Sequence, residues 1–205
     1  MPRIRAASID EHKALTRRAL LDAAYSLIAE AGTAQVALAE VALAAGVGRT
    51  TLYDYFSDRD DLIAALVEEE LPNVVSDLID SVPSDLPIRD QLAELAARTV
   101  EFVATDRVFG VILHREVGRM GLGAQERIRE SHSDLSSTIA GLYARGVGEG
   151  IFDPLPPVLA GRLIQDTIMS AARVLIDGSA EPKTVTEALQ RFLLKGLGDD
   201  GRTGS

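Results

Sequence analysis

The apolar residues between Leu15 and Ala31 recur every three or four positions, and this spacing constrains the fold more than any other feature. It places one continuous apolar stripe along an α-helix. Gly32 follows the stripe directly, and glycine is the residue that most often ends a helix. Similar spacing recurs along the chain, and we find no convincing strand pattern. The sequence therefore predicts an all-α protein.

About nine helices are expected from this spacing and from the positions of glycine and proline. After the first helix, we expect short helices over 38–45 and from Gly48 to Tyr55, and a fourth helix that Pro72 kinks or ends. The later helices are predicted over the ranges 88–105, 107–118, 122–147, 156–177 and 183–197.

The composition excludes several classes of protein. The 205 residues are 46% hydrophobic and 25% charged, which is typical of a globular chain. There are no cysteines and only three histidines, so we expect no metal site, and no other cofactor is indicated. No apolar stretch is long enough for a membrane span, and no secretory signal is visible, so a cytoplasmic protein is expected.

The charge is unevenly distributed. A net charge of −10 argues against nucleic-acid binding when the chain is taken as a whole. Residues 1–18, however, carry five basic and two acidic side chains, whereas the acidic excess lies in the C-terminal part. Because salt screens fields beyond roughly 10 Å, the total charge does not exclude a DNA-binding surface near the N-terminus.

Residues 38–55 carry the most informative pattern, two short helices joined by a tight turn. Ala42 is small enough for a close helix crossing, and Gly46 suits the chain reversal. The apolar residues are spaced to pack the pair onto the first helix, which leaves Arg49, Thr50, Thr51, Tyr53, Asp54 and Tyr55 for the exposed face and its rim. Such side chains suit phosphate and base-edge contacts in a major groove. An ordinary helical hairpin with a solvated polar face would give the same pattern.

Residues Arg18 to Leu62 resemble the N-terminal domain of the TetR/AcrR family of bacterial transcriptional regulators. The matching positions are Leu20-Leu-Asp-Ala-Ala24, Leu27-Ile28, Gly32, Val41-Ala42, Ala45-Gly-Val47, Thr51-Leu-Tyr-Asp-Tyr-Phe56, Arg59 and Leu62. The resemblance implies a three-helix DNA-binding domain over 12–57, with its helix-turn-helix at about 36–55. It also implies a larger helical effector-binding and dimerisation domain over 58–198 and flexible termini at 1–11 and 199–205.

The resemblance assigns DNA contacts to the second of the two short helices. Arg49, Thr50 and Thr51 would begin the recognition helix and face bases or flanking phosphates. Tyr53 and Tyr55 would reach backbone phosphates through their hydroxyls.

Basic residues outside that helix are implied to add phosphate contacts. Arg59 would hold a phosphate near the start of the fourth helix. Arg17 and Arg18 would touch phosphate from the first helix, although a solvated helix face is an equal alternative for both. Arg3 and Arg5 could form a minor-groove arm, with a disordered terminus as the commoner outcome.

Three residues depart from the family pattern on the DNA side. Ala37 stands where the family prefers Thr or Ser, and Gly48 replaces the usual Ser or Thr cap of the recognition helix. Asp54 adds a carboxylate that either accepts a hydrogen bond from cytosine N4 or repels phosphate. These departures put the affinity for DNA, not the fold, in doubt.

The last two predicted helices carry broad apolar faces, and in the family such helices form the seam of a homodimer. The residues expected at this dimer interface are Leu163, Ile164, Ile168, Ala171, Leu175, Leu189, Phe192 and Leu193. The alternative is that these faces serve only the core of one subunit.

Family members hold a small organic effector in the C-terminal domain, but the sequence marks this pocket poorly. The candidate pocket residues are Phe109, Leu113, His114, Val117, Met120, His132, Gln165 and Met169. Each of them is more often plain core or surface than a ligand contact.

The predicted function is a ligand-responsive transcriptional regulator. The resemblance implies a repressor that binds a palindromic double-stranded DNA operator as a homodimer and is released by a small organic effector. The alternative is a dimeric helical regulator whose DNA binding is weakened or lost and which acts as a small-molecule-binding or scaffold protein. No GxSxG, HExxH or P-loop motif is present, and the sequence predicts no enzyme activity.

Overall fold

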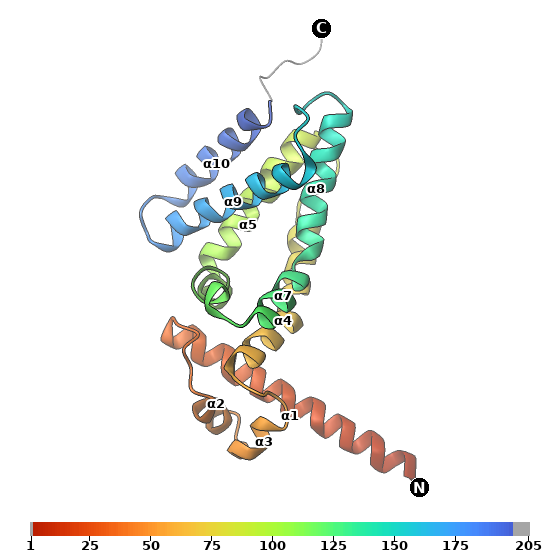
Figure 1. Ribbon diagram of the computed structural model, residues 1–205, viewed down its shortest axis with the longest axis vertical. Coiled ribbons are helices and arrows are strands. Elements are labelled where there is room, and N and C mark those ends of the chain that lie inside the picture. Colours follow the sequence, from red (N-terminus) through yellow and green to blue (C-terminus); the bar gives the residue numbers. More distant parts are fainter. Residues whose placement is uncertain (1, 199–205) are drawn as a thin grey trace. The chain divides into compact units, whose positions relative to one another are not determined.

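The computed structural model describes residues 2–198, and all their regular structure is helical, as predicted (Figure 1). The chain forms two compact units. Unit 1 joins the residues up to Glu70 with Arg107–Arg129. Unit 2 joins Leu71–Asp106 with the residues from Glu130 onward. The predicted segment 199–205 lies outside the described residues.

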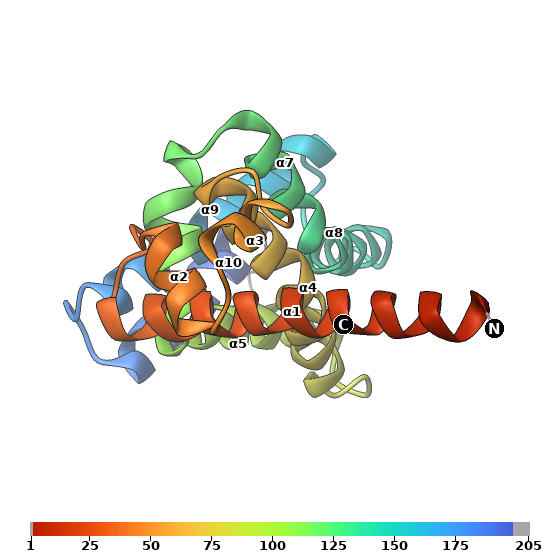
Figure 2. The same cartoon turned by 90° about the horizontal axis from the view of Figure 1, so that it is seen from below.

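Unit 1 is built around the first helix of the chain. Its elements are α1 (Pro2–Ala31), α2 (Leu38–Ala44), α3 (Arg49–Tyr53), the start of α4 (Arg59–Ser81), α6 (Arg107–Val111), the π-helical turn η1 (Ile112–Glu116), the 3-10 turn η2 (Val117–Arg119) and most of α7 (Leu122–Ser131). Figure 2 shows α2 and α3 lying side by side next to α1. The apolar stripe predicted on the first helix is buried at Leu20, Ala24 and Ile28.

Unit 2 is a four-helix arrangement around α5 (Ile88–Thr105). The helices that pack on α5 are α8 (Ser133–Gly148), α9 (Pro157–Ile176) and α10 (Pro182–Gly196). Leu92, Leu95, Ala96 and Val100 of α5 lie on the buried stripe of an amphipathic helix and form the centre of the core. The core is completed by apolar residues of the other three helices.

Helix ends differ from the prediction where local sequence and packing compete. The terminal segment 1–11 contributes to α1 from Pro2 onward, because no glycine or internal proline interrupts this helix before Ala31. Of the two outcomes predicted for Pro72, a kink or an end, the end does not occur, because α4 continues through Pro72 to Ser81. A proline costs an internal helix about 3 kcal/mol. Leu71 and Val75, buried on either side of it, provide the compensating packing.

Two predicted helices are divided. The expected helix over 107–118 consists of α6 followed by η1 and η2. The expected helix over 122–147 breaks at His132, whose φ of −120° and ψ of 20° lie outside the helical range. Here the run Ser131-His-Ser-Asp134 has low helix propensity, so little favours continuation of the helix.

The predicted domain boundary at 57/58 also differs from the compact units. Unit 1 continues into α4 as far as Glu70 and recruits residues 107–129 from the middle of the chain. This segment contributes buried apolar residues, such as Ile112 and Ile128, and long-range polar contacts, such as Arg127 with Glu68, which local sequence patterns do not reveal.

Candidate nucleic-acid interface

The turn between α2 and α3 has the geometry that was expected from Gly46. Gly46 adopts a φ of +70°, which L side chains rarely tolerate. The N–H of Val47 donates to the carbonyl of Ala42 at 3.0 Å, and the N–H of Gly46 donates to that of Leu43 at 3.1 Å. This pair of bonds is a Schellman motif, which satisfies carbonyls at the end of α2 and turns the chain into α3.

Packing separates the apolar and polar residues of the helix pair. Val41, Leu52 and Phe56 are buried. On the other side, Arg49 and Thr50 are exposed, and Thr51 is half-buried. Helix α3 therefore keeps an apolar side in the unit 1 core and leaves polar side chains accessible to a ligand.

The exposed side of α3 combines a cation, hydroxyls and a carboxylate. The Arg49 guanidinium lies 5.9 Å from the ring centroid of Tyr53, whose side chain is 46% exposed. Tyr55 is half-buried beside Phe56, with ring centroids 6.4 Å apart. Asp54 is exposed at the C-cap of α3. These groups offer donors to phosphate and one acceptor to a base.

The two departures at helix starts have limited structural cost. Ala37 caps α2 without a side-chain bond, but its N–H donates to Glu40 at 3.4 Å, which supplies half of a capping box. Gly48 caps α3 with extended backbone and likewise offers no side-chain bond. The chain thus forms both short helices without the two missing hydroxyls.

Arg18 and Arg59, two of the basic residues predicted outside α3, are engaged by carboxylates, and the side chains of the predicted arm residues Arg3 and Arg5 lie outside the described part of the chain. Arg18 pairs with Asp22 at 2.8 Å and with Glu69 at 3.5 Å, and it also donates to Glu70. Burial opposes the charge of Arg18, but the neighbouring carboxylates outweigh burial and raise its pKa. Phosphate binding by Arg18 would require an exchange of partners.

Arg59 is held in a similar way. It pairs with Asp60 at 3.2 Å and donates to the side-chain oxygen of Gln35. The Nε2 of Gln35 in turn donates to Glu116 at 2.6 Å, and Glu116 is only 3% exposed. A chain of polar contacts therefore links the loop before α2 to η1.

A second set of contacts fixes the loop that follows α3. Arg127 of α7 donates to Glu68 at 2.7 and 2.6 Å and to Asp61 at 2.7 Å. Asp61 accepts the backbone N–H of Ser57 at 2.9 Å. Burial raises the pKa of Asp61, but the bonds from Ser57 and Arg127 prevail and hold it below its ordinary value. The loop before α2 and the loop after α3 are thus both linked to residues 107–129.

Sequence reasoning missed Gln35, Glu116 and Arg127. None lies in a motif, and the bonds between Gln35 and Glu116 and between Arg127 and Glu68 join residues 81 and 59 positions apart in sequence. Only the tertiary arrangement brings them together.

The predicted effector residues divide between the two units. Phe109, Leu113, His114, Val117 and Met120 belong to unit 1, because residues 107–129 pack with the helix-turn-helix. His132, Gln165 and Met169 belong to unit 2, where Gln165 donates to Ser136 at 2.5 Å. The effector site stays a prediction.

The predicted dimer residues also divide, into core and surface. Ile164, Ile168, Leu189 and Leu193 are buried within unit 2, where they complete the hydrophobic core. Ala171 and Leu175 are half-buried. Leu163 and Phe192 remain 48% and 66% exposed.

Two family models match the chain. "Bacterial regulatory proteins, tetR family" matches residues 20–66, and "Tetracyclin repressor-like, C-terminal domain" matches residues 85–197, which is more than half of the chain. The chain belongs to the tetR family. This confirms the resemblance predicted from sequence. The protein is a helix-turn-helix transcriptional regulator and not an enzyme.

Relatives extend the match over most of the chain. The fatty acid metabolism regulator protein of Bacillus subtilis (strain 168) is 25% identical over 181 residues, covering 87% of this chain and 93% of the relative. The repressor LfrR of Mycolicibacterium smegmatis is 44% identical over 78 residues, covering 36% of this chain and 40% of LfrR. The structure of FadR from Bacillus subtilis with stearoyl-CoA shares the fold at a TM-score of 0.73 and 22% identity, covering 87% and 98% of the two chains.

Among the described residues, no helix is both long and apolar enough to cross a membrane. Nor does any group of three or more acidic or histidine side chains in that part of the chain have a metal-holding arrangement.

Proposed function

We propose that this protein is a repressor that binds a palindromic operator as a homodimer, acts in the cytoplasm and releases DNA when a small organic effector binds. The observation that carries the DNA-binding role is the exposed polar side of α3, with Arg49, Thr50 and Tyr53 accessible while Leu52 is buried. One such helix reads only a few base pairs, so specific binding calls for two copies at a fixed spacing.

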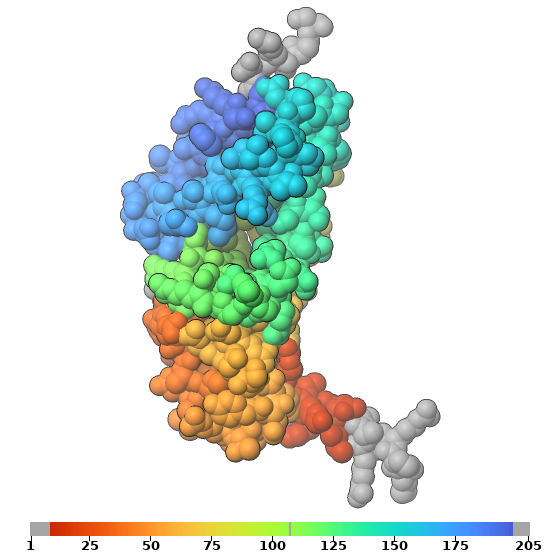
Figure 3. Space-filling model, viewed as in Figure 1, coloured from red at the N-terminus to blue at the C-terminus, as the bar shows by residue number. Residues whose placement is uncertain are grey.

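The homodimer is supported by the surface of α9 and α10. Leu159, Leu163, Val174 and Phe192 leave large apolar side chains exposed on these two helices. A mainly apolar hollow of about 900 Å³, lined by residues that include Ala171, Val174 and Phe192, lies between them. The two helices lie side by side in unit 2, in the blue part of Figure 3. Exposed apolar faces of this kind mark protein interfaces.

The experiment that tests the function is fluorescence anisotropy with DNA from upstream of the protein's own gene, at two salt concentrations and with competitor DNA present. Binding that resists competitor and weakens with salt supports the proposal, because phosphate contacts release counterions. Arg49→Ala should weaken binding and reduce the salt slope by about one.

The alternative is a regulator with weakened DNA binding. The engagement of Arg18 and Arg59 by carboxylates favours this reading, since both would have to change partners to hold phosphate. Loss of all binding under competitor, for operator candidates from across the genome, would support it.

The effector is proposed to be a small organic molecule that binds in the predicted pocket of the C-terminal domain. Because one structural relative was solved with stearoyl-CoA, acyl-CoA thioesters are the first compounds to screen for release of DNA. Gln165→Leu should reduce the potency of an effector that contacts this half-buried amide.

A further inference from the structure

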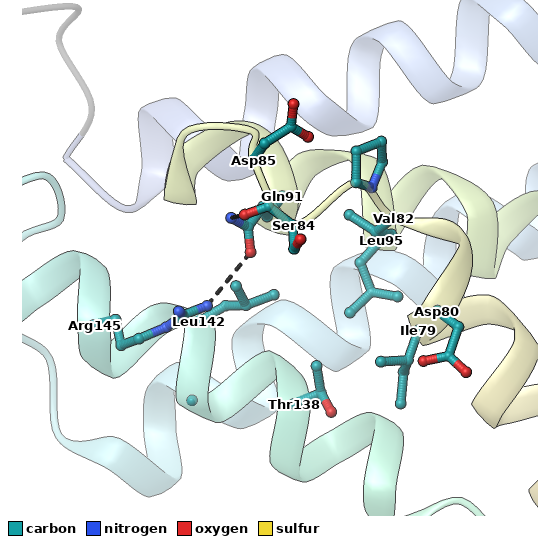
Figure 4. A pocket seen from close by; sticks show the side chains of 12 residues that line it. Ile79, Asp80, Val82, Ser84, Asp85, Gln91, Leu95, Thr138, Leu142 and Arg145 are labelled. Carbon is teal, nitrogen blue, oxygen red and sulfur yellow. Dashed lines mark hydrogen bonds between the residues drawn. The ribbon is translucent and has the colours of Figure 1, made fainter.

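A groove of about 870 Å³ opens in unit 2 beside the loop that joins α4 to α5 (Figure 4). Its walls are the end of α4, the loop residues 82–85, the start of α5 and one side of α8. None of the predicted DNA, effector or dimer residues lines it. The volume is typical of a site for a small organic molecule.

The floor of the groove is apolar. It is formed by Ile79, Val82, Leu95 and Leu142. Leu95 and Leu142 are buried among the core residues of unit 2, so the floor belongs to the fixed part of the fold. A hydrocarbon segment would lose water contact by lying here.

The loop wall is also held in place. The Nε2 of Gln91 donates to the carbonyl of Leu86 at 2.6 Å and to that of Ser84 at 3.1 Å. These bonds tie the loop to the first turn of α5. Hydrogen bonds to α5 therefore fix the loop that forms one wall of the groove.

The rim carries charges of both signs. Asp80 and Asp85 are exposed, and neither forms an ion pair or side-chain hydrogen bond within the described residues. Arg145 donates one long hydrogen bond, 3.4 Å, to Gln91. In Figure 4, Arg145 and Asp80 lie on opposite sides of the groove, with apolar side chains between them.

We propose that this groove binds an elongated zwitterion, with a carboxylate at one end, an ammonium group at the other and a hydrocarbon segment between them. The carboxylate would pair with Arg145, whose guanidinium has five donors and uses one of them weakly. The ammonium group would pair with Asp80 or Asp85, and the hydrocarbon segment would cover the apolar floor.

The charges of Arg145, Asp80 and Asp85 explain why a ligand with a single charge fits the groove less well. A monoanion satisfies Arg145 but approaches two carboxylates. A simple amine satisfies the carboxylates but leaves the guanidinium unpaired. Only a molecule with both charges, held apart by an apolar chain, complements both sides of the groove and its floor.

The test compares 6-aminohexanoate with hexylamine and hexanoate, each titrated into the full chain without DNA by calorimetry and by ligand-detected NMR. The zwitterion should bind about fivefold more tightly than either single-ended probe, the upper range for one exposed ion pair. Hexylamine also controls for general attraction of cations to a chain of net charge −10.

Charge variants assign the two ends. Arg145→Gln should remove the advantage of 6-aminohexanoate over hexylamine, and the double variant Asp80→Asn/Asp85→Asn should remove its advantage over hexanoate. The matched controls are Arg162→Gln and Asp77→Asn, exposed residues of α9 and α4 that do not line the groove. Both controls should bind like the unchanged protein.

A blocking variant tests the location. Gly141 lies on the groove wall in α8, and a Cβ built there meets no atom within 4 Å, so Gly141→Leu should fill the groove without disturbing the fold. Ala144→Leu, on the same helix but outside the groove, is its control. Gly141→Leu should abolish binding, and Ala144→Leu should retain it.

The proposal is overturned if the zwitterion shows no binding, if hexylamine or hexanoate binds equally well, or if the control variants weaken binding as much as the groove variants do. Because every readout is made without DNA, these outcomes are independent of whether the protein represses transcription.

Discussion

The guanidinium of Arg127 donates to Asp61 at 2.7 Å, and this contact joins α7 to the start of α4. Asp61 also accepts the N–H of Ser57, which lies three residues after Asp54, the C-cap of the recognition helix. Residues from the middle of the chain thereby position the DNA-binding helix pair, although they lie outside the matched N-terminal family model.

Arg127→Met should weaken operator binding and lower the free energy of unfolding by about 1–3 kcal/mol, because it leaves Asp61 and Glu68 without their partner. Anisotropy and urea denaturation measure the two effects. Arg129→Met removes an arginine that pairs with Glu126 on the same helix, and it is the control. Equal losses in both variants would contradict the positioning role.

Protonation of Asp61 should lower the free energy of unfolding of unit 1 as the pH falls into the acid range. Its folded-state pKa lies below the ordinary 3.8, so its contribution is present above that value and is lost as the pH falls through the folded value. Asp61→Asn should therefore destabilise the protein at pH 7 and lose less stability between pH 5 and pH 2. Urea denaturation across this range measures the difference, and Asp77→Asn should follow the unchanged protein.

Asp54→Asn should change base preference if Asp54 reads a base. A carboxylate only accepts hydrogen bonds and suits cytosine N4, whereas an amide donates and accepts and suits adenine. Selection from a randomised operator library is the measurement. The same selected sequence for both proteins would show that Asp54 simply faces water.

Phe192→Asp should convert the proposed homodimer to a monomer and reduce operator affinity by about 100-fold or more, since the second half-site is then no longer bound by a linked copy. Light scattering and anisotropy report the two effects. Leu122→Asp, which changes an 84% exposed leucine on α7, should leave both unchanged. If the Phe192→Asp variant is still a dimer, the interface must lie elsewhere.

Gly146→Ala should destabilise unit 2 by about 1–3 kcal/mol, because an added Cβ collides with the ring of Phe152. That ring stacks on Tyr143, with centroids 6.1 Å apart, so it has little room to move. Gly141→Ala, where a Cβ meets nothing, should instead be neutral or stabilising. Urea denaturation compares the two, and a Gly146→Ala/Phe152→Leu variant should lose less stability than the sum of its single changes.

Local sequence determined the helices and the helix-turn-helix. The spacing from Leu15 to Ala31 predicts the first helix, and the glycine at position 46 predicts the turn between α2 and α3. Both can be predicted because helix periodicity and a positive φ depend on neighbouring residues. The family followed from the same short stretch. The break at His132 was not predicted, and of the two outcomes predicted for Pro72 the structure excludes only the end of the helix, since α4 continues to Ser81.

The tertiary structure alone decided which side chains share a site. Gln35 meets Glu116, and Arg127 meets Asp61 and Glu68, only because residues 107–129 fold back onto the N-terminal helices. The tertiary structure also decided that Ile164 and Ile168 are buried while Leu163 is exposed. All three side chains are apolar and belong to the same sequence pattern. Apolar spacing says that a helix has a buried face, but the neighbours that cover that face are fixed by contacts distant in sequence.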